Sequence, residues 1–347
     1  MLAAAAGVAL LIALVWVLPS GGGVPSRTVQ PARVARRDPA SGVLRVANRG
    51  RLPAGAATVT DVVGGRPVEA TTPWVLPGAT RTVRYDLPTT RRGRYELGPL
   101  TLTRTDPLGL LRRQTSAAAP GSLLVHPRLL PVAAGRLGTS RAYEGATADS
   151  ALEGSIVFQS LREYVVGDDM RRVHWKTSAR TGTLMVKQHV DTLDNEVVLL
   201  LDDRRSPYAS DEDLEQAVDV AASMGDALRG AAVPCRVRTV SGTPLAGGES
   251  PRDRWTLLEG LAELPVDTTS GPAALGAALS RLPAASGLVL VTGALAGDQL
   301  ESLRLLGARV LVLCVTPAAM PQVPGQRLLA APDATALLAL WGAAAGR

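Results

Sequence analysis

The second half of the chain is constrained most strongly by short aliphatic runs that alternate with longer helical patterns. The runs Glu196–Leu201 and Arg309–Val315 are almost wholly aliphatic, which suits strands buried on both faces. Between them, Asp211–Arg229 repeats apolar residues at helical spacing. This alternation predicts an α/β domain over 195–347, with a Rossmann-like parallel sheet covered by helices. Further strands are expected over Cys235–Val240 and Gly287–Thr292, and further helices over Arg252–Leu264, Ala273–Leu282, Asp298–Leu306 and from Thr335 to Trp341.

The first half of the chain follows a different pattern. From about Thr28 to Val125, short segments of partly alternating polarity are separated by glycine and proline. Several short strands at this spacing predict a small β-sandwich over residues 27–130, and no catalytic spacing occurs within it. Residues 131–153 are rich in Gly and Ala and are interpreted as a linker.

An uncharged apolar run, Leu2–Leu18, precedes the predicted sandwich. Its length is at the short limit for crossing a bilayer about 30 Å thick, so it predicts a transmembrane helix over residues 1–19. The positive charges follow the run, which would place the rest of the chain in the cytoplasm and leave the protein as a single-pass membrane protein. A cleaved export signal is the alternative, and a preceding helix could be missing from the given start.

The net charge of +6 is concentrated in the first half, where residues 1–150 hold 19 arginines and 8 acidic residues. A basic half beside an apolar run is expected near anionic membrane lipid. Nucleic acid is the competing partner, but the arginines are scattered over predicted strands, with no basic helix and no aromatic stacking platform. We therefore expect no nucleic-acid partner. The preference for Arg over Lys, with abundant Ala, Gly and Pro, is typical of a GC-rich bacterial genome and suggests an actinobacterial source.

The two cysteines, Cys235 and Cys314, lie inside separate apolar runs. They have neither the spacing of a metal site nor that of a redox pair. We interpret them as buried structural thiols, which are compatible with a reducing compartment.

The most informative stretch is the signature segment, residues 154–194, whose centre runs from Phe158 to Lys187. Charged, aromatic and glycine residues are dense there, while the flanking sequence is plain. Their order is similar to the signature of the bacterial domain of unknown function 58 family. The matching residues are Arg162, Glu163, Tyr164, Gly167, Asp168, Asp169, Arg171, His174, Trp175, Lys176, Ala179, Arg180, Thr181, Leu184, Val186 and Lys187. Arg92–Tyr95 and Asp106–Leu110 agree with the same family upstream.

Two interpretations of the signature residues remain open. Carboxylates such as Asp168 and Asp169, set among guanidinium groups such as Arg171, can form charge-assisted hydrogen bonds that hold an irregular segment in place. The same residues, together with Trp175, can instead form a surface that a partner protein recognises. Arg162, Glu163, Tyr164, Gly167, Asp168, Asp169, Arg171, Trp175, Lys176 and Arg180 are therefore candidate structural or recognition residues, and we expect no catalytic residue among them.

Catalysis by this chain is disfavoured. His174 lies beside Asp168, Asp169 and Ser178 in sequence, so a hydrolase using His174 is an alternative, but there is no Gly-X-Ser-X-Gly elbow. A Walker A loop, a dinucleotide-binding glycine motif and a metal-binding Cys/His cluster are also missing from the sequence. We expect no enzyme, no cofactor and no small-molecule substrate.

The α/β half also resembles a von Willebrand factor A domain, a resemblance that implies an Asp-X-Ser-X-Ser loop holding Mg²⁺. The equivalent segment here is Asp202–Ser206, in which Arg204 replaces the middle serine. Because a guanidinium cannot be a metal ligand, Asp202 and Ser206 would form a vestigial cation site. Asp202 would then be held by Arg204 or Arg205, or would cap a nearby backbone turn. A Mg²⁺-dependent adhesion-type binding module is the alternative. The family resemblance implies a membrane-anchored scaffold or adaptor whose partner is a MoxR-type AAA+ ATPase.

Overall fold

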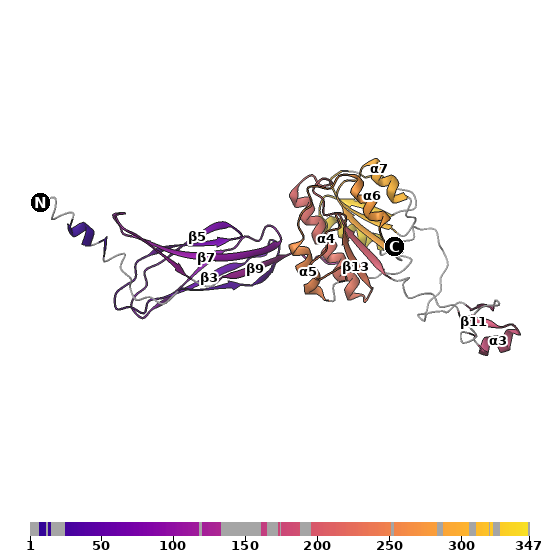
Figure 1. Cartoon of the computed structure of the whole chain (residues 1–347), viewed down its shortest axis with the longest axis horizontal. Coiled ribbons are helices and arrows are strands. Elements are labelled where there is room, and N and C mark those ends of the chain that lie inside the picture. Colours follow the sequence, from indigo (N-terminus) through magenta and orange to yellow (C-terminus); the bar gives the residue numbers. More distant parts are fainter. Residues whose placement is uncertain are drawn as a thin grey trace. The chain divides into compact units, whose positions relative to one another are not determined.

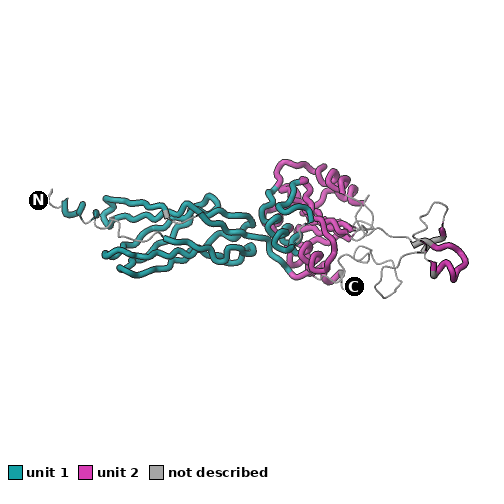
Figure 2. Tube along the Cα trace, turned by 60° about the horizontal axis from the view of Figure 1, so that its bottom comes forward, with its two compact units in different colours: residues 1–130, 218–223, 243–266 teal, residues 131–217, 224–242, 267–347 magenta. Residues whose placement is uncertain are grey.

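The computed structural model describes most of the chain and divides it into two compact units (Figure 2). Unit 1 contains residues 1–130, 218–223 and 243–266, and unit 2 contains residues 131–217, 224–242 and 267–347. The described residues are 7–11, 13–14, 25–117, 120–132, 161–164, 173, 175–187, 196–250, 253–282, 287–304, 310–318, 320–321 and 327–345.

Unit 1 is built on two β-sheets (Figure 1). One sheet has the order β1-β3-β6, and the other has the order β2-β9-β7-β4-β5, with β8 paired to β7. All of their pairings are antiparallel except that of β2 with β9. The strands are β1 Ser26–Gln30, β2 Arg33–Ala35, β3 Ser41–Ala47, β4 Ala57–Val63, β5 Arg66–Thr72, β6 Thr80–Asp86, β7 Gly93–Thr105, β8 Arg112–Ala117 and β9 Gly121–His126.

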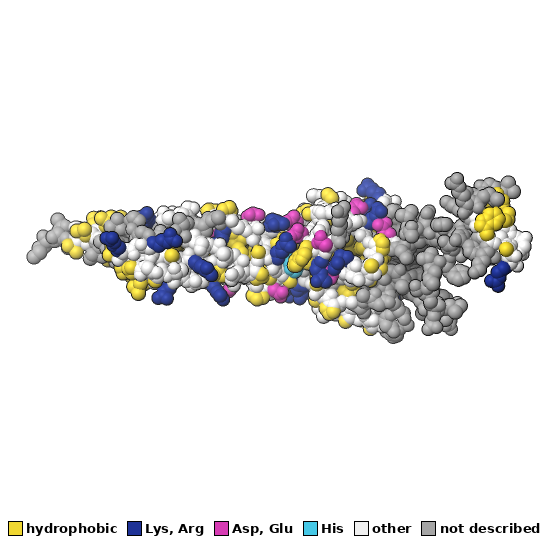
Figure 3. All heavy atoms as spheres, turned by 90° about the horizontal axis from the view of Figure 1, so that it is seen from below, with side chains coloured by type: hydrophobic (Ala, Val, Ile, Leu, Met, Phe, Trp, Pro, Cys, Tyr) yellow, Lys and Arg dark blue, Asp and Glu magenta, His cyan; other side chains and the backbone are white. Residues whose placement is uncertain are grey.

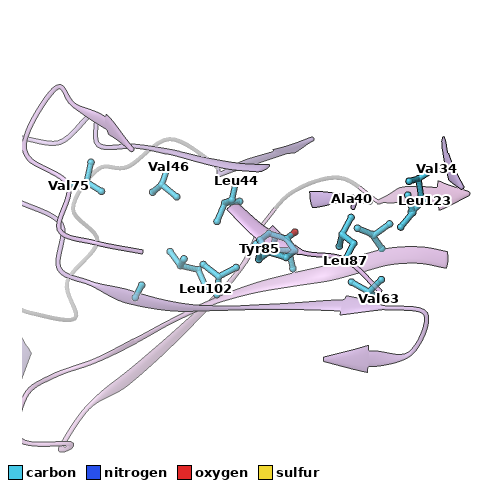
Figure 4. Packing of buried hydrophobic residues seen from close by; sticks show 14 of the residues in the cluster. Val34, Ala40, Leu44, Val46, Val63, Val75, Tyr85, Leu87, Leu102 and Leu123 are labelled. Atoms are coloured by element: carbon cyan, nitrogen blue, oxygen red, sulfur yellow. The ribbon is translucent and has the colours of Figure 1, made fainter. Parts of the chain in front are cut away.

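The two sheets enclose an aliphatic core. Leu44 and Val46 of β3 lie on one side and Leu102 of β7 on the other, and their side chains point into the space between the sheets (Figure 4). The burial of β4 alternates along the strand, as expected when one face of a sheet is packed and the other is not. The period-2 sequence pattern and the glycine and proline turns therefore account for this half of the fold.

A polar bridge crosses this core. Arg27 Nη1 of β1 donates to Asp61 Oδ1 of β4 at 2.7 Å, and Tyr85 Oη of β6 donates to Asp61 Oδ2 at 2.5 Å. Burial, followed by the bond to Asp61, raises the pKa of Tyr85. The buried carboxylate has a partner on each oxygen, which is the condition for tolerating a charge in the core.

One end of the sandwich is covered by helix α5 (Arg254–Glu263), which unit 1 includes. α5 contacts β9 and β7. The guanidinium of Arg92, a buried side chain at that end, donates to the carbonyl oxygens of Leu261 and Leu264 at 3.0 and 3.1 Å. Arg92 thus satisfies carbonyl groups at the carboxyl end of the helix, which lack partners within the helix.

Unit 2 contains a five-stranded sheet in which every pairing is parallel. The strand order is β13-β12-β14-β15-β16, which is 2-1-3-4-5 in chain order and one of the common doubly wound arrangements. The strands are β12 Val197–Leu201, β13 Cys235–Thr239, β14 Gly287–Thr292, β15 Val310–Val315 and β16 Arg327–Ala331. The helices beside this sheet in sequence are α4 Asp211–Gly230, α6 Ala273–Ser280, α7 Gly297–Arg304 and α8 Ala334–Ala345.

Both faces of this sheet are buried. Val198 and Leu290 pack with Leu275 of α6 and Leu303 of α7, while Leu199, whose side chain points to the other face of β12, is also fully buried. This explains why these strands are aliphatic at nearly every position instead of alternating. α4 begins at a capping box in which Ser210 and Asp213 bond each other's backbone, and its residues 218–223 group with unit 1.

The signature segment contributes a small β-α-β element to unit 2. Strand β10 (Leu161–Glu163) pairs antiparallel with β11 (Met185–Lys187), and helix α3 (Trp175–Thr181) lies between them in sequence (Figure 1). Most of the predicted linker and the signature residues Gly167, Asp168, Asp169, Arg171 and His174 lie outside the described residues.

The structure contradicts the prediction of a transmembrane helix over residues 1–19. Within the described part of the chain, no helix is long and apolar enough to cross a bilayer. Of the run Leu2–Leu18, the structure describes residues 7–11 and 13–14, which are helical. The predicted fold class, which began with this helix, and the predicted single-pass membrane location are therefore wrong.

Candidate functional site

The candidate site in unit 2 lies at the carboxyl edge of the parallel sheet. β12 and β14 are adjacent, and the strand order reverses between them, which is where doubly wound folds form their ligand crevice. Asp202 directly follows β12, and Thr292 is the last residue of β14. The backbone N–H of Asp202 donates to the carbonyl oxygen of Val291 at 2.8 Å, so the two strand ends are held together.

The guanidinium of Arg204 lies at these strand ends, beside the carboxylate of Asp202. Its Nε donates to Asp202 Oδ1 and its Nη2 donates to Asp202 Oδ2, both at 2.8 Å, which is a bidentate ion pair. Thr292 Oγ1 donates to Asp202 Oδ2 at 2.9 Å. The third guanidinium nitrogen, Nη1, donates to the carbonyl oxygens of Gly271 and Pro272 at 2.8 and 3.3 Å.

The pair is fully buried, with side-chain exposure of 1% for Arg204 and 0% for Asp202. The hydrogen bond to Asp202 raises the pKa of Arg204 against the opposing effect of burial. A buried ion pair is stable only when its remaining donors and acceptors are satisfied, and Thr292 and the two carbonyl groups do this here. The geometry is that of a closed structural site, because a positive charge already occupies the place beside the carboxylate.

Asp203 points to a second set of partners in unit 2. Its Oδ1 accepts the backbone N–H of Ser241 at 3.0 Å, and its Oδ2 accepts the Ser241 hydroxyl. Burial raises the pKa of Asp203, and the two bonds from Ser241 oppose that rise. Asp203 therefore ties the loop after β12 to the loop after β13.

Tyr208 and Gly293 complete the closure of the loop. Tyr208 Oη donates to the carbonyl oxygen of Asp202 at 2.7 Å, and burial together with the negative charge of Asp202 raises the pKa of Tyr208 well above its ordinary value. A Cβ atom on Gly293 would overlap the carbonyl group of Pro207, whose oxygen accepts the backbone N–H of Ala294 at 2.8 Å. Tyr208, Ser241 and the role of Gly293 could not be predicted from sequence, because their spacing from Asp202 follows no local pattern.

Asp202 and Ser206, which were predicted to form a vestigial cation site, lie in different surroundings. Asp202 is held by Arg204, which was one of the alternatives left open, while Arg205 Nε pairs with Asp211 Oδ1 at 2.7 Å. Ser206 is exposed. Among the described residues, no group of three or more His, Cys, Asp or Glu side chains is arranged to hold a metal ion. The residues after β12 therefore do not fit a resident Mg²⁺.

The second candidate site is the signature element around α3. β10 and β11 pair so that Arg162 lies opposite Val186 and Glu163 lies opposite Met185. The backbone N–H of Tyr164 continues this ladder by donating to the carbonyl oxygen of Leu184 at 2.8 Å. Ser178 faces inward, is buried, and accepts the backbone N–H of Met185 through its Oγ at 2.8 Å.

Two large apolar side chains of this element are exposed. Trp175 is 62% exposed and Leu184 is 40% exposed. Ala179, one helical turn after Trp175, is exposed, and so is Arg180. Lys176 lies in the same helix, which ends before Gly182 at a positive φ of 73°. The structure thus brings Tyr164, Trp175 and Arg180 onto one small element, whereas Gly167, Asp168, Asp169 and Arg171 lie outside the described residues.

These features define a class: a chain with a β-sandwich unit and a doubly wound α/β unit whose crevice is closed by an internal ion pair. Residues 160–328 match the family described as "Protein of unknown function DUF58". The match covers residues 160–194 of the signature segment and most of unit 2, and it confirms the resemblance inferred from that segment.

Two kinds of relatives are similar to parts of the chain. The "Uncharacterized protein YeaD" of Bacillus subtilis (strain 168) is 27% identical over 154 residues, which is 44% of this chain and 37% of that protein. The chain therefore spans little more than a third of this curated relative. Among solved structures, the CARDB domain of the PF1109 protein from Pyrococcus furiosus, in complex with di-metal ions, is 16% identical, with a TM-score of 0.24 over 30% of this chain and 93% of that chain. A putative cell surface protein domain from Methanosarcina acetivorans is 16% identical, with a TM-score of 0.21 over 30% of this chain and 97% of that chain.

Proposed function

We propose that this chain is a non-enzymatic scaffold or adaptor that binds a partner protein through the signature element around α3. The observation that supports this proposal is the exposure of Trp175. The chain has five tryptophans, and Trp341 is fully buried, whereas Trp175 is 62% exposed. Tryptophan is enriched among residues that dominate binding energy at protein interfaces.

The element is built to present this side chain. Ser178 anchors the inner face of α3 to the backbone of Met185, which turns Trp175 and Ala179 outward. Leu184 and Arg180 are exposed on the same element and add an apolar and a basic side chain. An exposed aromatic anchor with a nearby arginine has the composition of an interface core. As the family resemblance implies, the partner is a MoxR-type AAA+ ATPase.

The alternatives from other functional classes are less well supported. A Mg²⁺-dependent adhesion-type module needs an open carboxylate after β12, and the guanidinium of Arg204 already binds both oxygens of Asp202. We interpret unit 2 as a von Willebrand factor A-like domain in which this ion pair replaces the cation. A hydrolase using His174 would need an accessible nucleophile, but the neighbouring Ser178 is buried against Met185. An actinobacterial source stays a prediction.

The test is binding of the tagged full-length chain to a purified MoxR-type AAA+ ATPase. Trp175→Ala should lower the affinity at least tenfold and leave the melting temperature unchanged, because an exposed side chain contributes little to folding. The matched control is Trp255→Ala, which removes a tryptophan of similar exposure, 45%, from helix α5 in unit 1. This control should keep the wild-type affinity. Absence of micromolar binding by the wild type, or an equal loss in both variants, would refute the proposal.

A further inference from the structure

An apolar patch with basic surroundings lies at the end of the sandwich opposite α5. The antiparallel registers Ala47↔Thr80, Ala57↔Thr72 and Thr58↔Thr103 place the connections 48–56, 73–79 and 106–111 together at this end. These connections carry five large apolar side chains that are between 47% and 64% exposed: Leu52, Trp74, Leu76, Leu108 and Leu110. We call these five residues the loop patch. In the space-filling view, hydrophobic side chains gather at this end among scattered basic ones (Figure 3).

The loops that carry the patch are ordered by buried polar residues. Asn48 is buried, and its Nδ2 donates to the carbonyl oxygens of Leu52 and Val75, both at 2.8 Å. Asp106 is also buried and accepts the backbone N–H groups of Leu108 and Leu111. The patch is therefore part of a defined turn structure. An exposed apolar patch on a folded surface marks a contact site for a protein or for a lipid surface.

The charged residues around the loop patch are basic. The three connections contain a single acidic residue, Asp106, and it is buried. Arg49 and Arg51 lie in the first connection and are exposed, and Arg112, which directly follows the third connection, is also exposed. The chemistry that complements this end therefore combines an apolar part with negative charge.

Two arginines on adjacent strands add to the positive charge. Arg104 of β7 lies directly opposite Arg113 of β8, close to the turn that joins these strands. Like charges directly opposite each other in a sheet are destabilising, and burial together with the positive charge of Arg113 lowers the pKa of Arg104. An anion beside this pair would offset the repulsion. The guanidinium group suits phosphate in particular, because its planar fork binds two oxygens at once.

The placement of the apolar side chains fits a lipid surface better than a peptide. All five lie in connections between strands, and none lies on a strand. The common modes of peptide recognition use a groove or the edge of a sheet, whereas this patch is formed by loops. The interfacial layer of a bilayer favours tryptophan, and it accepts arginine with the stem in the apolar layer and the charge at the headgroups.

We propose that the loop patch docks on an anionic lipid surface. Trp74 and the four leucines enter the apolar layer, and Arg49, Arg51 and Arg112 contact the phosphate groups. The contact is peripheral and is made by loops of unit 1, so it differs from the single-pass helix that the structure contradicts. It weakens as the salt concentration rises, because its arginine part is electrostatic.

The experiment is cosedimentation of the full chain with vesicles of phosphatidylcholine, with or without phosphatidylglycerol. We expect binding at low salt to the vesicles that contain phosphatidylglycerol. Leu108→Ser with Leu110→Ser should lower this affinity at least about tenfold, because both side chains lose their burial in the apolar layer. Arg49→Gln with Arg51→Gln should lower it at least about fivefold. Both variants should keep the wild-type melting temperature, because all four side chains are exposed.

The matched controls remove the same kinds of side chain away from the patch. Arg66→Gln with Arg84→Gln deletes two exposed charges on β5 and β6, and Leu340→Ser deletes a leucine of α8 that is 46% exposed. Both controls should bind the vesicles as the wild type does. Trp175→Ala should also keep vesicle binding, so the lipid contact and the proposed adaptor function succeed or fail separately.

Three outcomes would overturn the proposal. A wild-type chain that stays in the supernatant with both kinds of vesicle makes no such contact. Equal binding by the wild type and by the Leu108→Ser, Leu110→Ser variant would place the lipid contact elsewhere, and equal losses in the two arginine double variants would assign it to net charge alone. Binding of polyglutamate through Arg49 and Arg51, without binding of vesicles, would assign the patch to an acidic polypeptide.

Discussion

Arg36 and Asp219, which are 183 residues apart in the chain, form a fully buried ion pair with Arg36 Nη2 2.7 Å from Asp219 Oδ2. Arg128 joins the same carboxylate through its backbone N–H at 2.8 Å and its Nε at 3.0 Å. Both residues of the pair belong to unit 1, so the carboxylate of α4 is part of the structure that contains the β-strands.

Asp219→Asn should destabilise unit 1 strongly. The substitution leaves the buried Arg36 without a counter-charge, and removing one partner of a buried pair costs about 3–5 kcal/mol. Urea unfolding followed by tryptophan fluorescence measures the change. Glu301→Gln, which removes the carboxylate of the solvent-exposed Arg304 pair, is the control and should leave the midpoint unchanged. Similar midpoints for Asp219→Asn and the wild type would show that the pair contributes little.

Arg204→Ser should convert the closed crevice into a cation-responsive one. The variant leaves Asp202 buried without its partner and creates the sequence Asp-Asp-Ser-Arg-Ser over residues 202–206. We expect a lower melting temperature that millimolar Mg²⁺ partly restores, because a cation can then neutralise the carboxylate. Calorimetry with and without Mg²⁺ measures this.

Arg204→Met is the matched control, since it removes the same charge without adding an oxygen ligand. It should be destabilised and remain insensitive to Mg²⁺. A wild-type chain that Mg²⁺ stabilises equally would contradict the interpretation that Arg204 takes the place of a cation.

Asp203 should make the stability of unit 2 depend on pH. Burial raises its pKa in the folded state above the ordinary value of about 4, so the folded chain binds the proton more tightly than the unfolded chain. The free energy of unfolding therefore falls as pH rises from about 4 through the folded pKa of Asp203. Above that pKa, the contribution of Asp203 to the unfolding free energy no longer changes with pH.

Asp203→Asn tests this, because an amide keeps the geometry toward Ser241 without titrating. We expect its curve of unfolding free energy against pH to be flatter than that of the wild type, and its stability at pH 7 to be at least equal. Urea titrations between pH 4 and 7 measure both quantities. A wild-type-like slope in the variant would assign the pH dependence to another group.

Gly293→Ala should destabilise unit 2, because the added Cβ would overlap the carbonyl group of Pro207. Overpacking of this kind typically costs about 1–3 kcal/mol. Gly276→Ala is the matched control: in helix α6 its Cβ would lie 3.6 Å from Ser302 Oγ, an ordinary contact. That variant should be neutral or more stable by up to about 1 kcal/mol. Thermal unfolding of the two variants distinguishes the positions, and equal effects would contradict the close approach.

The elements of unit 2 were largely predictable from sequence. The runs expected at Glu196–Leu201, Gly287–Thr292 and Arg309–Val315 are strands within one residue of those bounds, and Asp211–Arg229 is the helix α4. Strand β16 (Arg327–Ala331) was missed, because its short run Leu-Leu-Ala-Ala has no β-branched residue and follows a proline-rich segment. The transmembrane prediction was wrong: within the described part of the chain, no helix is long and apolar enough to cross a membrane.

The sequence by itself determined which segments become strands and helices, the family match, and the replacement of a serine by Arg204. These depend on residues that are neighbours in the chain, where periodicity and residue type act directly. Only the tertiary structure decided that Arg204 closes on Asp202, that Ser241 and Tyr208 hold the same loop, and that Arg36 pairs with Asp219. Such contacts join residues from different elements, and they are set by packing and by the pairing of buried charges, which no local pattern records.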